Sequence, residues 1–129
     1  MKKKVLLMSL LVIGAMALPA EAATTKAKYI ANCVKFSQQV NPQMRTDMGA
    51  QKSACTCICE QVEALGASEE DLRTIMKYTR EYDFTTIPKQ PTFQQILQAH
   101  VDVHRDILKT QDDLELFVKS MMSCSGDAQ

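Results

Sequence analysis

Three cysteines on alternate residues, Cys55, Cys57 and Cys59, are the most distinctive chemical feature of this sequence. They lie in the stretch SACTCICEQ, and the whole chain has five cysteines. Thiols can ligate metals, catalyse redox exchange or form structural disulfides. On a helix, successive residues turn by about 100°, so Cys55 and Cys59 share a face while Cys57 points nearly the opposite way. The cluster alone therefore does not form a compact three-thiolate site.

The remaining two cysteines, Cys33 and Cys124, lie far from the cluster along the chain. We expect one cluster cysteine to pair with Cys33 and another with Cys124, which ties the first and last helices to the second. Five cysteines with one left over allow about 15 two-bridge arrangements, and spacing does not decide between them. Our preference is Cys33 with Cys57 or Cys59, and Cys55 or Cys59 with Cys124. The fifth cysteine is then a small buried hydrophobe or a bridge to a second copy of the chain.

A thiolate metal site is the main alternative for the cysteines. Thiolates of Cys33, Cys55, Cys59 and Cys124 could hold zinc, and nearby methionines would suit copper(I). The C-x-x-C motif of thiol–disulfide catalysts is missing, so redox catalysis has less support. Four methionines flank the same helical stripes: Met44, Met48, Met121 and Met122.

A second candidate metal pair is His100 and His104 in the stretch HVDVH. Residues four apart lie on one helix face and can clasp copper or zinc. Catalytic zinc helices carry glutamate directly after the first histidine, where this chain has Val101. The simpler interpretation leaves the metal out: His100 packs with a hydrogen-bonded ring nitrogen, and His104 faces solvent near Asp106 or Glu63.

A proline-bearing loop, DFTTIPKQPT, is the longest interruption between the expected helices. Long loops with prolines often carry binding residues. Neither a nucleophile–histidine–carboxylate set nor a glycine-rich phosphate loop stands out, so the sequence predicts no enzyme activity. The candidate interaction residues of the loop are Tyr82, Phe84, Ile87, Pro88 and Pro91.

The elements that must position these residues are helices, because apolar residues recur at intervals of three and four. The fold class is therefore an all-α, disulfide-braced bundle of four to five helices. Ser68 with Asp71, and Thr92 with Gln95, have the spacing of capping boxes, and Gly66 is suited to end a helix. Expected helices are Thr25–Val40, Pro42–Leu65, Glu69–Tyr82, one from Phe93, and one that Asp112 caps, unless the last two form one kinked helix.

Apolar stripes on these helices predict the core. The predicted core positions are Ile30, Cys33, Ser37 and Val40; Met44, Met48, Gln51, Cys55, Ile58, Val62 and Leu65; Leu72, Ile75 and Met76; Phe93, Ile96, His100, Val103 and Ile107; and Leu114, Phe117, Met121 and Cys124.

The N-terminal segment is typical of a bacterial export signal. Lys2–Lys4 precede a mainly apolar run of fourteen residues, Val5–Leu18, which is too short for a membrane span of about 20 residues. Pro19 and the small-x-small pattern Ala20–Ala22 follow. We therefore expect cleavage after Ala22, which makes residues 1–22 a signal peptide and residues 23–129 one helical domain. The destination is the periplasm of a Gram-negative bacterium or the exterior, without stable membrane insertion.

Charge limits the choice of partner. The chain has 15 basic and 15 acidic residues; without residues 1–22, which hold three lysines and one glutamate, 12 and 14 remain. A chain without basic excess and with few aromatic residues is poorly suited to bind nucleic acid.

The early helical cysteine followed by a C-x-C cluster resembles small exported helical proteins of Gram-negative bacteria, over about Tyr29–Leu65. The resemblance implies no particular activity or site. We expect a non-enzymatic protein without a cofactor that binds an unknown protein or small ligand. The alternatives are a copper- or zinc-binding protein and an envelope chaperone. The odd cysteine also allows a disulfide-linked dimer.

Overall fold

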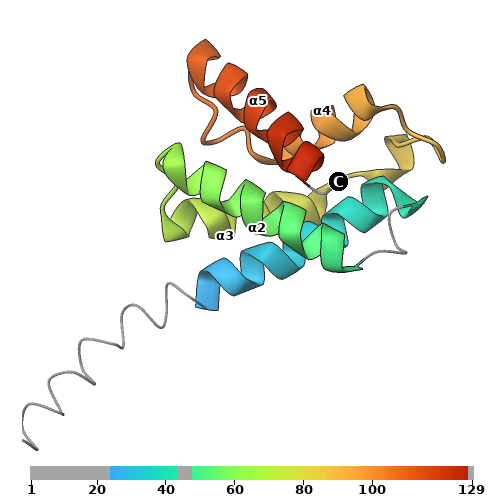
Figure 1. Ribbon diagram of the computed structural model, residues 1–129, viewed down its shortest axis with the longest axis horizontal. Helices are drawn as coiled ribbons and strands as arrows, with labels where there is room; N and C mark the ends of the chain where they lie inside the picture. The colour runs from blue at the N-terminus through green and yellow to red at the C-terminus, as the bar shows by residue number, and fades with distance from the viewer. Residues whose placement is uncertain (1–23, 44–47, 128–129) are drawn as a thin grey trace, which may run out of the picture.

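Every regular element in the described part of the chain is a helix, which confirms the predicted all-α class (Figure 1). The computed structural model describes residues 24–43 and 48–127; the expected signal peptide, residues 1–22, lies outside this part. A first helix over residues 24–40 precedes α2 (Met48–Ala64), α3 (Glu69–Glu81), the 3-10 helix η2 (Phe84–Thr86), α4 (Phe93–Val103) and α5 (Gln111–Asp127). None of the helices over these residues has the length and hydropathy of a membrane span.

The first helix and α2 form an antiparallel pair. Three contacts, each further along the chain from the connection between the two helices, show this. Near the connection, Gln38 Nε2 donates to Gln51 Oε1 at 3.0 Å. Further along, Cys33 is bonded to Cys55, and at the far end Lys26 Nζ lies 3.3 Å from Glu63 Oε1. Cys33 stands seven residues before the end of the first helix, and Cys55 stands seven residues after the start of α2. Residues equidistant from the connection of an antiparallel pair face each other, which explains why these two cysteines meet.

The opposite side of α2 is joined to α5. Cys57 is bonded to Cys124, with a Cα–Cα distance of 5.7 Å. Ser120 Oγ of α5 also donates to Gln61 Oε1 of α2 at 3.2 Å. As expected, one cluster cysteine joins Cys33 and another joins Cys124. Both preferred pairings were wrong. Cys33 bonds to Cys55 and not to Cys57 or Cys59, because Cys55 is the cluster residue level with Cys33 in the helix pair. Cys124 bonds to Cys57 and not to Cys55 or Cys59.

The remaining helices complete the layers around this centre. In Figure 1, α5 lies along α2, and α4 crosses beside α5; α2 packs on α5, α5 on α4, and α4 on α3. The core between them contains aliphatic, aromatic and sulfur-bearing side chains. Its most enclosed large members are Tyr29, Val40, Val62, Ile75, Val103 and Phe117.

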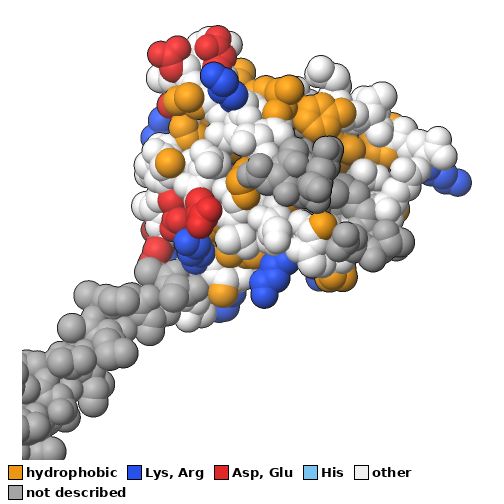
Figure 2. Space-filling view, viewed as in Figure 1, with side chains coloured by type: hydrophobic (Ala, Val, Ile, Leu, Met, Phe, Trp, Pro, Cys, Tyr) orange, Lys and Arg blue, Asp and Glu red, His pale blue; other side chains and the backbone are white. Residues whose placement is uncertain are grey.

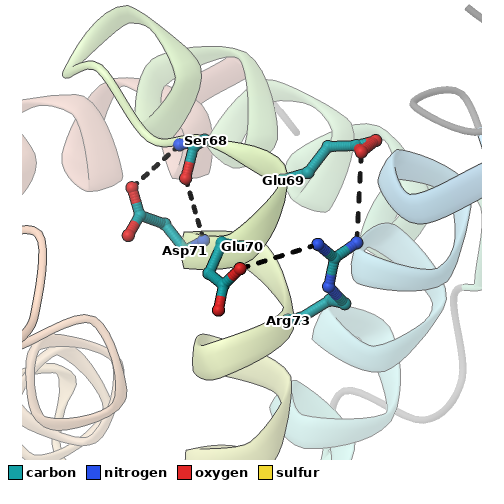
Figure 3. Close-up of polar contacts among 5 residues, drawn as sticks. All are labelled: Ser68, Glu69, Glu70, Asp71 and Arg73. Atoms are coloured by element: carbon teal, nitrogen blue, oxygen red, sulfur yellow. Dashed lines mark hydrogen bonds and ion pairs between the residues drawn. The ribbon is translucent and has the colours of Figure 1, made fainter. Parts of the chain in front are cut away.

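Helix caps account for several boundaries. Ser68 and Asp71 form the predicted capping box at α3, in which each side chain accepts from the other residue's backbone N–H (Figure 3). Thr92 and Gln95 do the same at α4. Gly66 ends the preceding segment with φ +97°, a left-handed conformation that glycine adopts without strain. Near residue 110 the prediction was wrong: the Thr110 hydroxyl accepts from the Asp113 N–H at 3.0 Å, so Thr110 is the cap and not Asp112.

Two expected boundaries differ from the structure. The second helix was predicted to start at Pro42, whereas α2 starts at Met48 and residues 42–43 form a 3-10 turn. Met44 lies outside the described residues. The expected helix near Phe93 is separate from α5, because α4 ends at Val103. Ile107, which the prediction placed on the stripe of that helix, is buried but lies in the connection after it.

Several predicted core positions were also wrong. Met48 and Phe93 are 56% and 46% exposed. On the first helix the predicted Cys33 and Val40 are buried, but Tyr29 and Phe36 are buried in place of the predicted Ile30 and Ser37, which lie one position later in each case. A helical period leaves two neighbouring stripes nearly equivalent, and the larger aromatic side chains take the side that faces the bundle.

The two bridges should contribute unequally to stability. In the chain-entropy model, closing a sequence separation of 22 residues contributes about 3.4 kcal/mol, and a separation of 67 contributes about 4.4 kcal/mol. We expect the C57A/C124A variant to lose about 1 kcal/mol more unfolding free energy than C33A/C55A, measured by urea denaturation under oxidising conditions. The same variants measured after reduction give the packing cost of the alanines for subtraction. A larger corrected loss in C33A/C55A would contradict this order.

Candidate functional site

Of the five cysteines, one is a free thiol, and it is buried. Four cysteines form bridges, and Cys59 remains free with 0% of its surface exposed. Burial and then Glu63 raise the pKa of the Cys59 thiol to about 11, although Lys26 opposes the shift. A thiol with such a pKa stays protonated and is a poor nucleophile and metal ligand at neutral pH.

This geometry does not support the zinc or copper(I) alternative. Cys33, Cys55 and Cys124 carry no thiolate because each is in a disulfide. In the described part of the chain no three His, Cys, Asp or Glu residues come together as a group that could hold a metal ion. The buried position of Cys59 also keeps its thiol from a second copy of the chain, so this fold gives no support to the disulfide-linked dimer.

His104 is buried in a hydrogen-bonded network, and its expected position facing solvent was wrong. Only 3% of its surface is exposed. Its Nδ1 lies 2.6 Å from the carbonyl oxygen of His100, and its Nε2 lies 2.7 Å from the hydroxyl of Tyr29. A carbonyl only accepts, so Nδ1 carries the proton and Nε2 accepts from Tyr29. Both ring nitrogens are therefore occupied, which leaves no lone pair for a metal.

His100 is also buried, but among rings. It is 3% exposed, and the ring of Phe36 meets its ring at 5.1 Å between centroids with an interplanar angle of 85°. The His100 and His104 rings are stacked with their centroids 6.5 Å apart. Burial and then the neighbouring His104 lower the pKa of His100 to about 3, and burial lowers that of His104 to about 4. Both histidines are consequently neutral at physiological pH.

The proline loop supplies aromatic residues to a surface groove. Tyr82 and Phe84 each contact the ring of Phe36, with centroids 5.4 and 5.5 Å apart. Asp83 orders this turn by accepting from the backbone N–H and hydroxyl of Thr85. Of the other candidate loop residues, Ile87 packs partly on the core, Pro88 is exposed and Pro91 is half-buried. The structure therefore brings together two of the five loop candidates.

The groove has a volume of about 360 Å³ and lies between the first helix and the end of α3, within the size of ligand sites. Lys35 and Arg80 are exposed at its edge and form no ion pair with any residue that the structure describes. The hydroxyl of Thr79 has a single hydrogen and lies 2.6 Å from the carbonyl oxygen of Met76 and 2.8 Å from the side-chain amide of Asn32, so it joins the first helix to α3 at the groove. The full lining is Asn32, Lys35, Phe36, Gln39, Thr79, Arg80, Tyr82 and Phe84.

Most of this lining was missed in the sequence. Lys35 and Gln39 stand four apart and Asn32 three residues earlier, so they share one helix face. A polar helix face usually indicates only solvent exposure. The feature that distinguishes this face from an ordinary exposed one is the aromatic loop beside it, and the sequence does not show that the two are close. Burial and then Asp102 and Asp83 raise the pKa of Tyr82 above its ordinary value, so its hydroxyl stays protonated at neutral pH.

No protein-family model matches this chain, and no curated protein sequence or solved structure does either.

Removing the Tyr29 hydroxyl tests the histidine network. In Tyr29→Phe the buried Nε2 of His104 loses its donor, which should lower the unfolding free energy by about 1–3 kcal/mol. Tyr78→Phe is the matched control, because Tyr78 donates to Asp106 at an exposed position; its loss should stay below about 1 kcal/mol. Equal losses in urea denaturation would contradict the buried bond.

Stability should fall in mild acid. The folded-state pKa values of about 3 and about 4 lie below the ordinary value of 6.5, so the unfolded chain binds more protons between these limits. The full contribution is present above pH 6.5 and decreases by about 1.4 kcal/mol per pH unit for each histidine below it. Urea denaturation at pH 7.5, 6.0 and 5.0 measures this slope. His100→Phe should reduce it by about half, and a pH-independent free energy would contradict it.

Proposed function

We propose that this chain is a small exported helical protein of the periplasm or the cell exterior that binds a ligand without converting it. Two disulfides are consistent with an oxidising compartment, where such bonds persist. The export signal expected in residues 1–22 would lead to that destination. Binding is favoured over catalysis because the described titratable groups of the core are neutral or engaged.

The groove beside the proline loop is the proposed ligand site. Its decisive feature is that two exposed cations, Lys35 and Arg80, line the groove together with aromatic side chains. Cations without ion-pair partners favour an anionic group, and rings favour a planar or apolar body. A ligand of this site should therefore carry a carboxylate or another anion next to an aromatic or apolar portion.

The walls of the groove are rigid enough for such selectivity. Phe36 is 2% exposed and contacts Tyr82, Phe84 and His100. The first helix, which carries one wall, is held to α2 by the Cys33–Cys55 bridge. A site held in one conformation loses less entropy when it binds. The Cys33–Cys55 bridge thus supports binding by holding a wall of the groove in position, and it does not itself contact the ligand.

Three small probes test the two requirements separately. Benzoate combines a ring and an anion, benzamide keeps the ring without the charge, and acetate keeps the charge without the ring. In NMR titrations of the oxidised protein, benzoate should bind most tightly and shift the resonances of Tyr82 and Phe84. Equal binding of all three probes, or shifts confined to other parts of the molecule, would contradict the proposal.

The cations can be tested by substitution. Lys35→Ala and Arg80→Ala should each weaken benzoate binding by about two- to fivefold, because exposed charge pairs contribute about 0.2–1 kcal/mol. Lys109→Ala is the matched control, since Lys109 is exposed but does not line the groove. The difference between the variants and the control should shrink in high salt.

A further inference from the structure

A second, smaller cavity lies across the Phe36–His100 contact from the groove. The first helix, α2, α4 and α5 each contribute side chains to it, and most of them are apolar. Figure 2 shows hydrophobic side chains gathered over α4 on the face in view, and Phe93, at the start of α4, is 46% exposed at the edge of this cavity. The lining residues are Ser37, Gln51, Ala54, Cys55, Ile58, Phe93, Ile96, Leu97, His100 and Met121.

Gln51, which lines this apolar cavity, holds a buried hydrogen-bond donor without a partner in the described part of the chain. The residue is 3% exposed, and its Nε2 has no partner among the residues that the structure describes. Its orientation is set by Gln38, whose Nε2 donates both to Met48 Sδ at 2.8 Å and to Gln51 Oε1 at 3.0 Å. A thioether sulfur only accepts, so Gln38 must present its N–H groups and Gln51 its oxygen.

A buried donor without a partner costs free energy, and a ligand acceptor can recover it. None of the lining side chains is acidic or basic apart from His100, which is neutral at physiological pH. A carboxylate entering the cavity would therefore lose its hydration without meeting a cation. The complementary acceptor is neutral, as in the carbonyl of an amide.

The volume of the cavity limits the size of the apolar group that a ligand can insert beside its carbonyl. The cavity measures about 70 Å³, well below the roughly 150 Å³ of an apolar cavity that holds benzene. One branched aliphatic side chain fits part-way into such a space, whereas an extended acyl chain does not. Single apolar side chains set in a pocket are the usual anchors of protein–protein interfaces.

We propose that this cavity anchors one aliphatic side chain of a partner polypeptide, with the partner's backbone carbonyl accepting a hydrogen bond from Gln51 Nε2. The exposed ring of Phe93 extends the apolar contact at the edge. This site is distinct from the aromatic groove and does not rest on the function proposed for it, because the two share no lining residue.

The test uses the oxidised, exported protein labelled with ¹⁵N and the probe N-acetyl-leucine methylamide. Saturable shifts should appear at the side-chain amide of Gln51 and the backbone amides of Ala54, Ile96 and Leu97. N-acetyl-glycine methylamide, which lacks the side chain, should bind at least about fivefold more weakly. Hexanoate is the acyl-chain comparison and should cause no saturable shift at these residues.

Two variants separate the donor from the cavity. Gln51→Met keeps the length of the side chain without the N–H groups and should weaken the probe by about two- to tenfold. Gln94→Met is its control, because Gln94 is exposed on α4 and does not line the cavity. Ala54→Leu fills the space and should abolish the shifts.

The proposal is overturned if the leucine probe gives no saturable shift, if the glycine probe binds equally well, or if hexanoate binds in its place. Unchanged affinity in Gln51→Met would remove the hydrogen bond from the proposal. If Gln51→Met does not fold, the probe series on the natural sequence and the Ala54→Leu variant still decide between these outcomes.

Discussion

The antiparallel pairing of the first helix with α2 fixes the positions of most other features of the molecule. The Cys33–Cys55 bridge sets its register. In that register Gln38 meets Gln51, and Lys26 meets Glu63 at the far end. Counting outward equally from the connection also places Cys59 level with Tyr29, where there is no second cysteine. The free thiol is thus a consequence of register, and the space that it occupies is closed to solvent and to other thiols.

The second bridge uses the opposite side of α2, and this makes α2 the common support for both candidate sites. Cys57 holds α5, which contributes Met121 to the small cavity. Cys55 holds the first helix, which contributes Phe36 to the groove and Ser37 to the cavity. Cysteines on alternate residues of a helix diverge, which is why Cys55 and Cys57 join two different neighbours and the cluster does not converge on one metal.

The sequence was sufficient to predict those features that depend only on residues close together along the chain. The helical period, both capping boxes and the left-handed Gly66 are of this kind, and the structure confirms them. The cysteine partners, the burial of His104 and the groove depend on which helices meet. The preferred pairing went wrong because it was chosen without knowing the register of the helix pair. With the start at Met48, Cys55 stands opposite Cys33 by simple counting.

The rings of Phe36 and His100 separate the groove from the small cavity. Phe36 lines the groove, His100 lines the small cavity, and their rings meet edge to face at 5.1 Å. Such a contact belongs to the core, since both residues are at most 3% exposed. A substitution at either ring would alter both sites and the stability of the bundle together, so it could not assign a ligand to one of them. Arg80 lines only the groove and Gln51 lines only the small cavity, so substitutions at these two residues can assign a ligand to one site.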